Sequence, residues 1–146
     1  MSAEHTQLQV QEVLDAFVRE ANVVGVQVSD RSGAPLALSG DLFRVDPRRF
    51  AASLAGLVGN ATGLMRPFGQ AGVRQMHLHA GDVELLVSLL NPGYTVAVIF
   101  DDRSSLGVVR WRMSRLSGHL IGLLGGSTKG PPMGQISDEE IENLFT

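Results

Sequence analysis

Two histidines, His77 and His79, have the spacing that comes nearest to a chemical site in this sequence. Alternate positions of a β-strand lie on one face, so both imidazoles would point to the same side. Two such rings can begin a zinc site, but zinc takes three or four ligands, and no third ligand has a recognisable spacing. We therefore interpret the pair as part of a polar, partly exposed strand face.

Two other segments have the composition of chemical sites. Asp101 and Asp102, at the end of an expected strand, could bind magnesium, although carboxylates just before a helix are usually caps and dipole partners. Residues 125–129, GGSTK, resemble a phosphate-binding loop in composition but lack the spacing G-x-x-x-x-G-K-[ST]. The chain contains no cysteine and no G-x-S-x-G nucleophile motif. We expect no catalytic residues, no cofactor and no metal, and hence no enzyme with a substrate of its own.

Composition points to one domain with its own core, since the chain has 146 residues. A net charge of −3 does not favour a nucleic-acid partner or an anionic membrane surface. The first residues lack the basic and apolar regions of a signal peptide, and no apolar run approaches the ~20 residues of a membrane span. Together with the absence of cysteine, this predicts a cytoplasmic domain without membrane insertion.

The hydrophobic pattern predicts an alternation of helices and strands that begins and ends with a helix. The expected elements are a helix at 6–19, strands at 23–29 and 35–39, a long helix at 46–68, strands at 73–79, 83–90 and 94–100, and a last helix after Ser105. Because the connections between the strands are short, neighbouring strands should be antiparallel. The order α-ββ-α-βββ-α therefore predicts an α+β fold, a five-stranded antiparallel sheet with helices on both faces, over residues 6–124.

The long helix has two unlike faces. Asp46 and Pro47 favour its start, because the carboxylate can cap the helix and proline needs no hydrogen-bond acceptor there. One face carries a core-facing apolar stripe: Phe50, Leu54, Leu57, Ala61, Leu64, Met65 and Phe68. The opposite face carries only small residues: Ala52, Gly56, Gly59 and Gly63. Each interior glycine costs a helix about 1 kcal/mol relative to alanine. We interpret this line as a site of close approach by a partner backbone, the alternative being neutral drift in an exposed helix.

The C-terminal part differs in composition from the domain. Residues 125–136 form an expected flexible linker rich in glycine and proline, and residues 137–146 an amphipathic tail. Ser137 and Glu140 match a capping box, and Ile141, Leu144 and Phe145 share one face of a short helix. Such a helix is too short to be stable alone, which leaves the domain's own surface, a partner's groove or disorder. Arginines on the last helix suggest a solvated basic side or a contact with an acidic partner: Arg103, Arg110, Arg112 and Arg115.

Three pieces of this sequence resemble the Roadblock / dynein-light-chain family, and the prokaryotic MglB-like branch in particular. They are GVQVSDRSGAPL at 25–36, the small-residue helix LAGLVGNA at 54–61, and VAVIFD at 96–101 followed by SLG at 105–107. These motifs are hydrophobic and glycine patterns rather than catalytic signatures. Together they extend the resemblance over roughly residues 6–124.

The resemblance implies a homodimer in which the middle helices of two subunits lie antiparallel and the central strands join into one sheet. Family members act on Ras-like small GTPases, and the MglB-like ones serve as GTPase-activating proteins or co-regulators of cell polarity and motility. On this chain the dimer interface would comprise Ala52, Gly56, Gly59, Gly63, His77 and His79. A GTPase would contact Arg49, Ser53, Asn60 and Arg66, and in some members also a tail such as Ile141, Leu144 and Phe145.

MglB-like activators insert no catalytic arginine and instead remodel the residues of the GTPase, so no arginine finger is assigned to this chain. Two other functions remain open. One is a scaffold of the same fold that assembles a complex without a GTPase, and the other is a small-molecule sensor, since similar sheets also form ligand pockets.

Overall fold

The computed structural model describes residues 3–42, 45–69, 72–90 and 93–125. The helices are α1 (Ala3–Ala21), α2 (Pro47–Met65) and α3 (Leu106–Leu124), with a short 3-10 helix, η1 (Arg66–Phe68), directly after α2. The strands are β1 (Gly25–Asp30), β2 (Pro35–Gly40), β3 (Gln75–Ala80), β4 (Val83–Leu90) and β5 (Tyr94–Phe100). The predicted order of elements is confirmed, and β4 and β5 have the predicted bounds.

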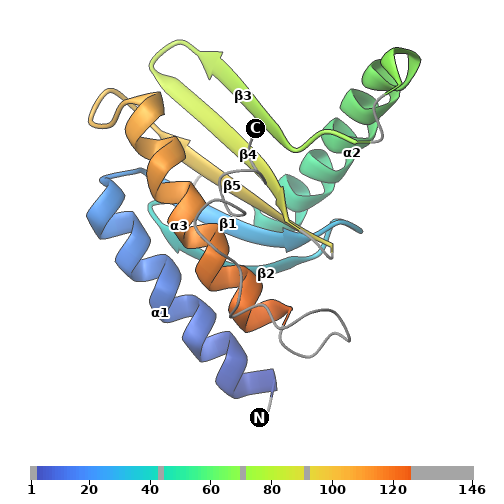
Figure 1. Cartoon of the computed structure of the whole chain (residues 1–146). Helices are drawn as coiled ribbons and strands as arrows, with labels where there is room; N and C mark the ends of the chain where they lie inside the picture. The colour runs from blue at the N-terminus through green and yellow to red at the C-terminus, as the bar shows by residue number, and fades with distance from the viewer. Residues whose placement is uncertain (1–2, 43–44, 70–71, 91–92, 126–146) are drawn as a thin grey trace.

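All five strands form one antiparallel sheet in the order β2-β1-β5-β4-β3. The central strand β5 pairs with both β1 and β4, while β2 and β3 lie at the two edges (Figure 1). Helices α1 and α3 contact each other across one face of the sheet, and α2 lies on the other face (Figure 1). The predicted α+β class, with helices on both faces, is confirmed.

Local side-chain chemistry explains why several elements begin where they do. Asp46 caps α2, because its Oδ1 accepts hydrogen bonds from the backbone N–H groups of Arg48 and Arg49 at 3.0 and 3.5 Å. Ser105 caps α3 by accepting a bond from the backbone of Val108 at 3.3 Å. In the β1–β2 turn Gly33 has a φ of 101°, a conformation that other residues rarely adopt.

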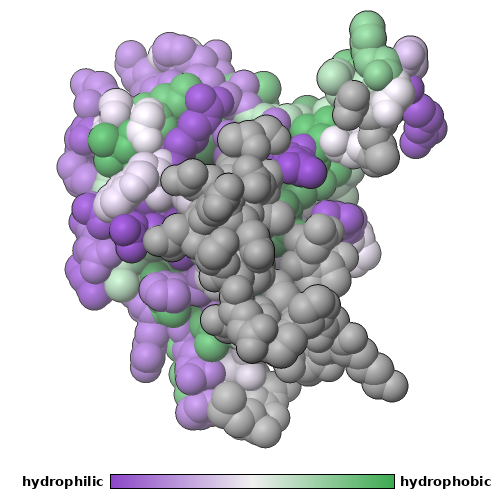
Figure 2. Space-filling model, viewed as in Figure 1, coloured by the Kyte–Doolittle hydropathy of each residue, from purple (hydrophilic) through white to green (hydrophobic). Residues whose placement is uncertain are grey.

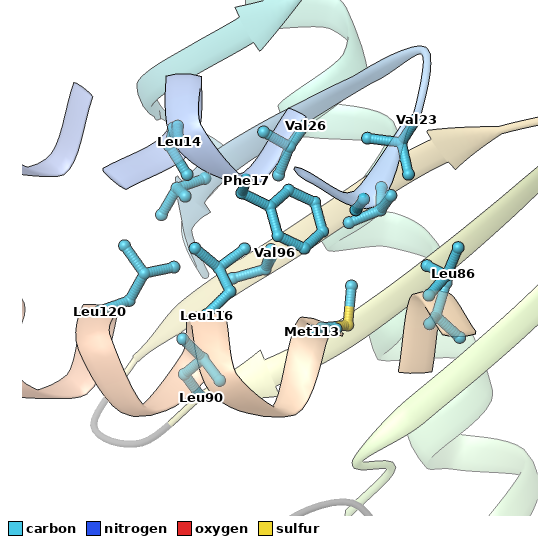
Figure 3. Close-up of a cluster of buried hydrophobic side chains, with 14 of the residues drawn as sticks. Leu14, Phe17, Val23, Val26, Leu86, Leu90, Val96, Met113, Leu116 and Leu120 are labelled. Atoms are coloured by element: carbon cyan, nitrogen blue, oxygen red, sulfur yellow. The ribbon is translucent and has the colours of Figure 1, made fainter. Parts of the chain in front are cut away.

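The main core lies between the sheet and the pair α1 and α3. Alternate residues of the central strands point toward these helices, as Val26 and Val96 show in Figure 3. The helices contribute Leu14 and Phe17 from α1, and Met113 from α3, to the same cluster (Figure 3). All five residues are at most 6% exposed, so this core is closed to solvent.

A second, smaller cluster joins α2 to the opposite face of the sheet. Leu54 packs with Val87 and Ala97, and Phe50 lies partly buried beside them. The buried side chain of Gln27 donates a hydrogen bond of 2.9 Å to the carbonyl of Pro47, which ties the start of α2 to β1. Helix α2 is therefore attached to the sheet by its first half.

The predicted linker (125–136) and tail (137–146) lie outside the described residues, except for Gly125 at the end of α3. None of the helices that the structure describes combines the length and apolarity needed to cross a membrane.

Candidate interaction surface

The second half of α2 extends away from its own sheet. Within α2 only Ala51 and Leu54 are buried. Leu64, Met65 and Phe68 are 73%, 41% and 73% exposed, and the end of the helix projects from the rest of the molecule (Figure 2). The prediction that the whole apolar stripe faces the core is wrong for these three residues. Helical periodicity shows which residues share a face, but it does not show what lies opposite that face.

The length of α2 also indicates this arrangement, and helical periodicity does not take that length into account. A helix of 19 residues is about 28 Å long. A strand of six residues, such as β1, is only about 20 Å long. A helix attached by its first turns to such short strands must extend past them.

The glycine line of α2 is uncovered in the single chain. A methyl group added at Gly56, Gly59 or Gly63 would meet no atom within 4 Å. The fourth member, Ala52, instead lies beside the β1–β2 turn, where a Cβ on Gly33 would come within 3.3 Å of the Ala52 Cα. No contact among the described residues therefore requires glycine at positions 56, 59 and 63.

Apolar side chains near the β3 edge face the same side of the sheet as α2. Met76 and Leu78 of β3 alternate with the two histidines, and Met76 packs against the smaller core cluster. Leu78 and Val83 are 45% and 48% exposed. We use the name α2–β3 surface for the uncovered residues on this side of the sheet: Gly56, Gly59 and Gly63 on one face of α2, Leu64, Met65 and Phe68 toward its opposite face, and Leu78 and Val83 at the β3 edge.

The two histidines lie on the other side of β3, the side that faces α3. His77 Nε2 is 2.8 Å from Glu84 Oε1, and the ring stacks on Phe100 at a centroid distance of 6.3 Å. His79 stacks on His77 at 6.4 Å, and its Nε2 lies 3.1 Å from the carbonyl oxygen of Gly81. Both histidines thus belong to the edge strand, but neither side chain contributes to the α2–β3 surface.

The predicted GTPase contacts, Arg49, Ser53 and Asn60 on α2 and Arg66 at the start of η1, are all exposed. By helical spacing, Arg49, Ser53 and Asn60 lie along one flank of the glycine line, and Arg66 lies on the other flank. The predicted tail contacts, Ile141, Leu144 and Phe145, lie outside the described residues.

In the part of the chain that the structure describes, no three His, Asp or Glu side chains come together to hold a metal ion. The surface instead offers exposed apolar side chains, uncovered glycines and a strand edge. These features suit contact with another protein chain rather than chemistry on a small molecule.

Comparison with known proteins agrees with this architecture. The sequence model of the Roadblock/LC7 domain matches residues 9–100, which is more than half of the chain. Comparison with curated protein sequences gives no match.

Several solved structures have the same fold. Myxococcus xanthus MglB is 25% identical, with a TM-score of 0.76 over 81% of this chain and 96% of that one. The gliding protein MglB of Thermus thermophilus is 22% identical, with a TM-score of 0.77 over 87% and 95% of the two chains. An MglB described with a tetrameric arrangement is 21% identical, with a TM-score of 0.75 over 84% and 91%. The chain therefore belongs to the Roadblock/LC7 domain family.

Proposed function

We propose that the chain is a homodimeric regulatory module that binds a Ras-like small GTPase in the cytoplasm and acts as its activator or co-regulator. The observation that carries this proposal is the α2–β3 surface, which a single copy leaves open to solvent. The similarity of the chain to MglB structures, and the function implied by the MglB-like resemblance, support the choice of partner.

The energetics favour covering this surface with a second copy. Burying one exposed leucine, methionine or phenylalanine contributes about 1.5–3 kcal/mol. In a two-fold symmetric dimer both copies present the same patch, so each such residue is buried in both copies and its contribution counts twice. Leu64, Met65 and Phe68 of one copy would then lie against the partner. The glycines at 56, 59 and 63 are on the opposite face of the helix, where they would allow a second helix backbone to approach closely.

The resemblance implies that central strands join across the dimer, but β1, β5 and β4 already pair on both sides, so the strand proposed for a second contact is the edge strand β3. Edge strands carry unpaired backbone groups that can accept a strand from another chain. Two β3 strands that pair with each other would join two five-stranded sheets into one, with His77 and His79 at the junction. Pairing of β3 with β3 and contact between the α2 helices would occur together around one two-fold axis.

A GTPase would then bind the surface that the paired helices build. Arg49, Ser53, Asn60 and Arg66 stay exposed beside the glycine line and supply polar and basic contacts. The tail residues Ile141, Leu144 and Phe145 are a proposed additional contact. No arginine finger is proposed, so any acceleration of hydrolysis would arise from rearranged residues of the GTPase itself.

The test mixes the purified protein with each small GTPase of its own cell, loaded with either GDP or a non-hydrolysable GTP analogue. We expect binding to one of them that depends on the bound nucleotide. Phosphate release from the same GTPase loaded with GTP then distinguishes an activator from a co-regulator that only binds.

Light scattering on the protein alone tests the dimer separately, with about twice the chain mass of 15.6 kDa expected. A dimer that binds no GTPase in either nucleotide state would contradict the regulatory function and would favour a scaffold of the same fold. A monomer at all concentrations would contradict the proposed dimer itself.

A further inference from the structure

An exposed aromatic residue bracketed by arginines lies on α3, on the opposite side of the sheet from the α2–β3 surface. Trp111 is 53% exposed, and the guanidinium carbons of Arg112 and Arg115 lie 5.1 and 4.7 Å from its ring centroid. Val108, one turn earlier on the helix, is 49% exposed. We call these four residues the Trp111 surface.

The charge and apolar area of the Trp111 surface are largely unmatched among the described residues. Arg112 has one ion pair, with Glu20 at 3.8 Å, and Arg115 has none within the described ranges. Stacking on the indole ring orients both guanidinium groups, while leaving their N–H groups able to bind carboxylates. A partner for this surface should therefore combine apolar side chains with negative charge.

The C-terminal segment of the same chain has this chemistry. Residues 136–146, ISDEEIENLFT, contain four carboxylates, at positions 138, 139, 140 and 142, and apolar residues at 136, 141, 144 and 145. In a helical conformation Asp138 and Glu142 lie one turn apart beside Ile141 and Phe145. This arrangement places acidic groups next to an apolar stripe, as the Trp111 surface requires.

We propose that residues 136–146 dock on the Trp111 surface of α3 when the protein is free. The apolar stripe of the segment covers Trp111 and Val108, and its carboxylates bind Arg112 and Arg115. The segment includes Ile141, Leu144 and Phe145, the additional GTPase contact proposed above, so docking on the Trp111 surface concerns the protein without a GTPase, and its test uses the protein alone.

The connecting chain is long enough for this contact. Trp111 lies 14 residues before Gly125, a distance of about 21 Å along the axis of α3. The ten residues 126–135 can span up to about 33–36 Å when extended. A segment tethered this closely has an effective concentration in the millimolar range, so even a weak contact is occupied.

Fluorescence of the intact protein tests the proposal, because Trp111 is the only tryptophan of the chain. Acrylamide, a neutral quencher, measures how accessible its ring is without being attracted by the arginines. The variant Asp138→Lys/Glu142→Lys should release the segment and raise the Stern–Volmer constant roughly twofold, since it uncovers an aromatic side chain. The matched control Glu4→Lys/Glu12→Lys makes the same change of net charge on exposed positions of α1 and should leave the constant unchanged.

Exchanging the charges of the arginines and the carboxylates tests the contact more strictly. Arg112→Glu/Arg115→Glu alone should also raise the accessibility of Trp111. Combining it with Asp138→Lys/Glu142→Lys should restore protection, because the two sides are again oppositely charged. High salt should reduce protection in the wild type, since it screens these charge pairs.

Three results would overturn the proposal. In the first, Asp138→Lys/Glu142→Lys is quenched as weakly as the wild type. In the second, protection disappears on dilution but does not depend on the segment, which would assign the Trp111 surface to a second copy. In the third, protection appears only after a GTPase is added, which would assign the segment to that partner.

Discussion

Asp15 links helix α1 to the edge strand β2. Its Oδ1 accepts hydrogen bonds from Ser39 Oγ at 2.5 Å and from Gln11 Nε2 at 3.0 Å. These two bonds, and then the charge of Arg19, hold the pKa of the Asp15 carboxyl below its usual range. A lowered pKa means that the ionised carboxylate stabilises the folded state.

The Asp15–Ser39 bond should make folding stability depend on pH. We expect Ser39→Ala to lower the free energy of unfolding by about 1 kcal/mol at pH 7, where Asp15 is ionised in both states. The contribution of a carboxylate with a lowered folded pKa is complete above its unfolded pKa and is lost as the pH falls through the folded one. The difference between wild type and variant should therefore shrink at pH 3. Urea unfolding at both pH values, at one protein concentration, measures it.

The control for this prediction is Ser53→Ala, which removes a hydroxyl from an exposed position of α2. It should change the stability little at either pH. An equal loss of stability at pH 7 and pH 3 in Ser39→Ala would show that the hydroxyl acts through packing rather than through the carboxylate.

Local chemistry was predictable from sequence at the residue scale, whereas long-range pairs were not. The cap formed by Asp46 and the positive φ of Gly33 depend on residues within the same turn, so composition and spacing indicate them. The contact between His77 and Glu84 depends on the register of β3 against β4, which pairs His79 with Glu84 and so makes His77 and Glu84 diagonal neighbours. Sequence spacing alone does not define that register.

At the scale of elements, α2 is helical over its whole length but packs on its own sheet over only part of that length. Its first half packs on the sheet through Leu54, while its second half is helical with little of its apolar area covered. The sequence predicted the helix and its cap at Asp46. It did not predict that the apolar stripe runs past the sheet, because that depends on where the helix is anchored.

The glycine line predicts an unusual response to substitution. Gly59→Leu should not disturb the single chain, since a Cβ there meets nothing within 4 Å, and leucine favours a helix over glycine by about 1 kcal/mol. In a close-packed pair of α2 helices the same side chain would force the backbones apart. We expect a folded monomer, measured by light scattering together with circular dichroism.

Gly122→Leu in α3 is the matched control, because it makes the same substitution at an exposed helical glycine with open space around it. It should leave the dimer intact. If Gly59→Leu also remains a dimer with wild-type affinity, the glycine line is not the interface.

The apolar end of α2 predicts a loss of dimer affinity without loss of folding. Phe68→Ser removes a side chain that is 73% exposed in the single chain, so the stability of the monomer should change little. If each copy loses about 1.5 kcal/mol of apolar burial, the dimer dissociation constant should rise by roughly 100-fold or more. Sedimentation over a range of concentrations measures this.

Leu8→Ser is the control for Phe68→Ser, since Leu8 is similarly exposed, at 65%, on α1. It should leave the dissociation constant unchanged. A dissociation constant for Phe68→Ser that equals the wild-type value would exclude the end of α2 from the interface.

At the scale of the whole molecule, the two sides of the sheet differ in how far helices cover them. The side of α1 and α3 contains the main core and carries the Trp111 surface on its outside. Among the described residues, the other side is covered only by the first half of α2, which leaves Leu64, Met65 and Phe68 exposed. Sequence patterns predicted the fold class and the family, because both follow from the order of elements. They could not predict which face stays open, which depends on the packing of α2.

Substituting polar residues of α2 and η1 should therefore weaken partner binding without affecting dimerisation. Arg49 and Arg66 are exposed and lie on opposite flanks of the glycine line. Arg49→Glu/Arg66→Glu should leave the dimer mass unchanged but weaken nucleotide-dependent GTPase binding by roughly tenfold or more, because it opposes charge complementarity at the interface. Arg19→Glu, exposed in the last turn of α1 on the other side of the sheet, should retain wild-type binding. Equal binding by all three proteins would place the GTPase on a surface other than the paired helices.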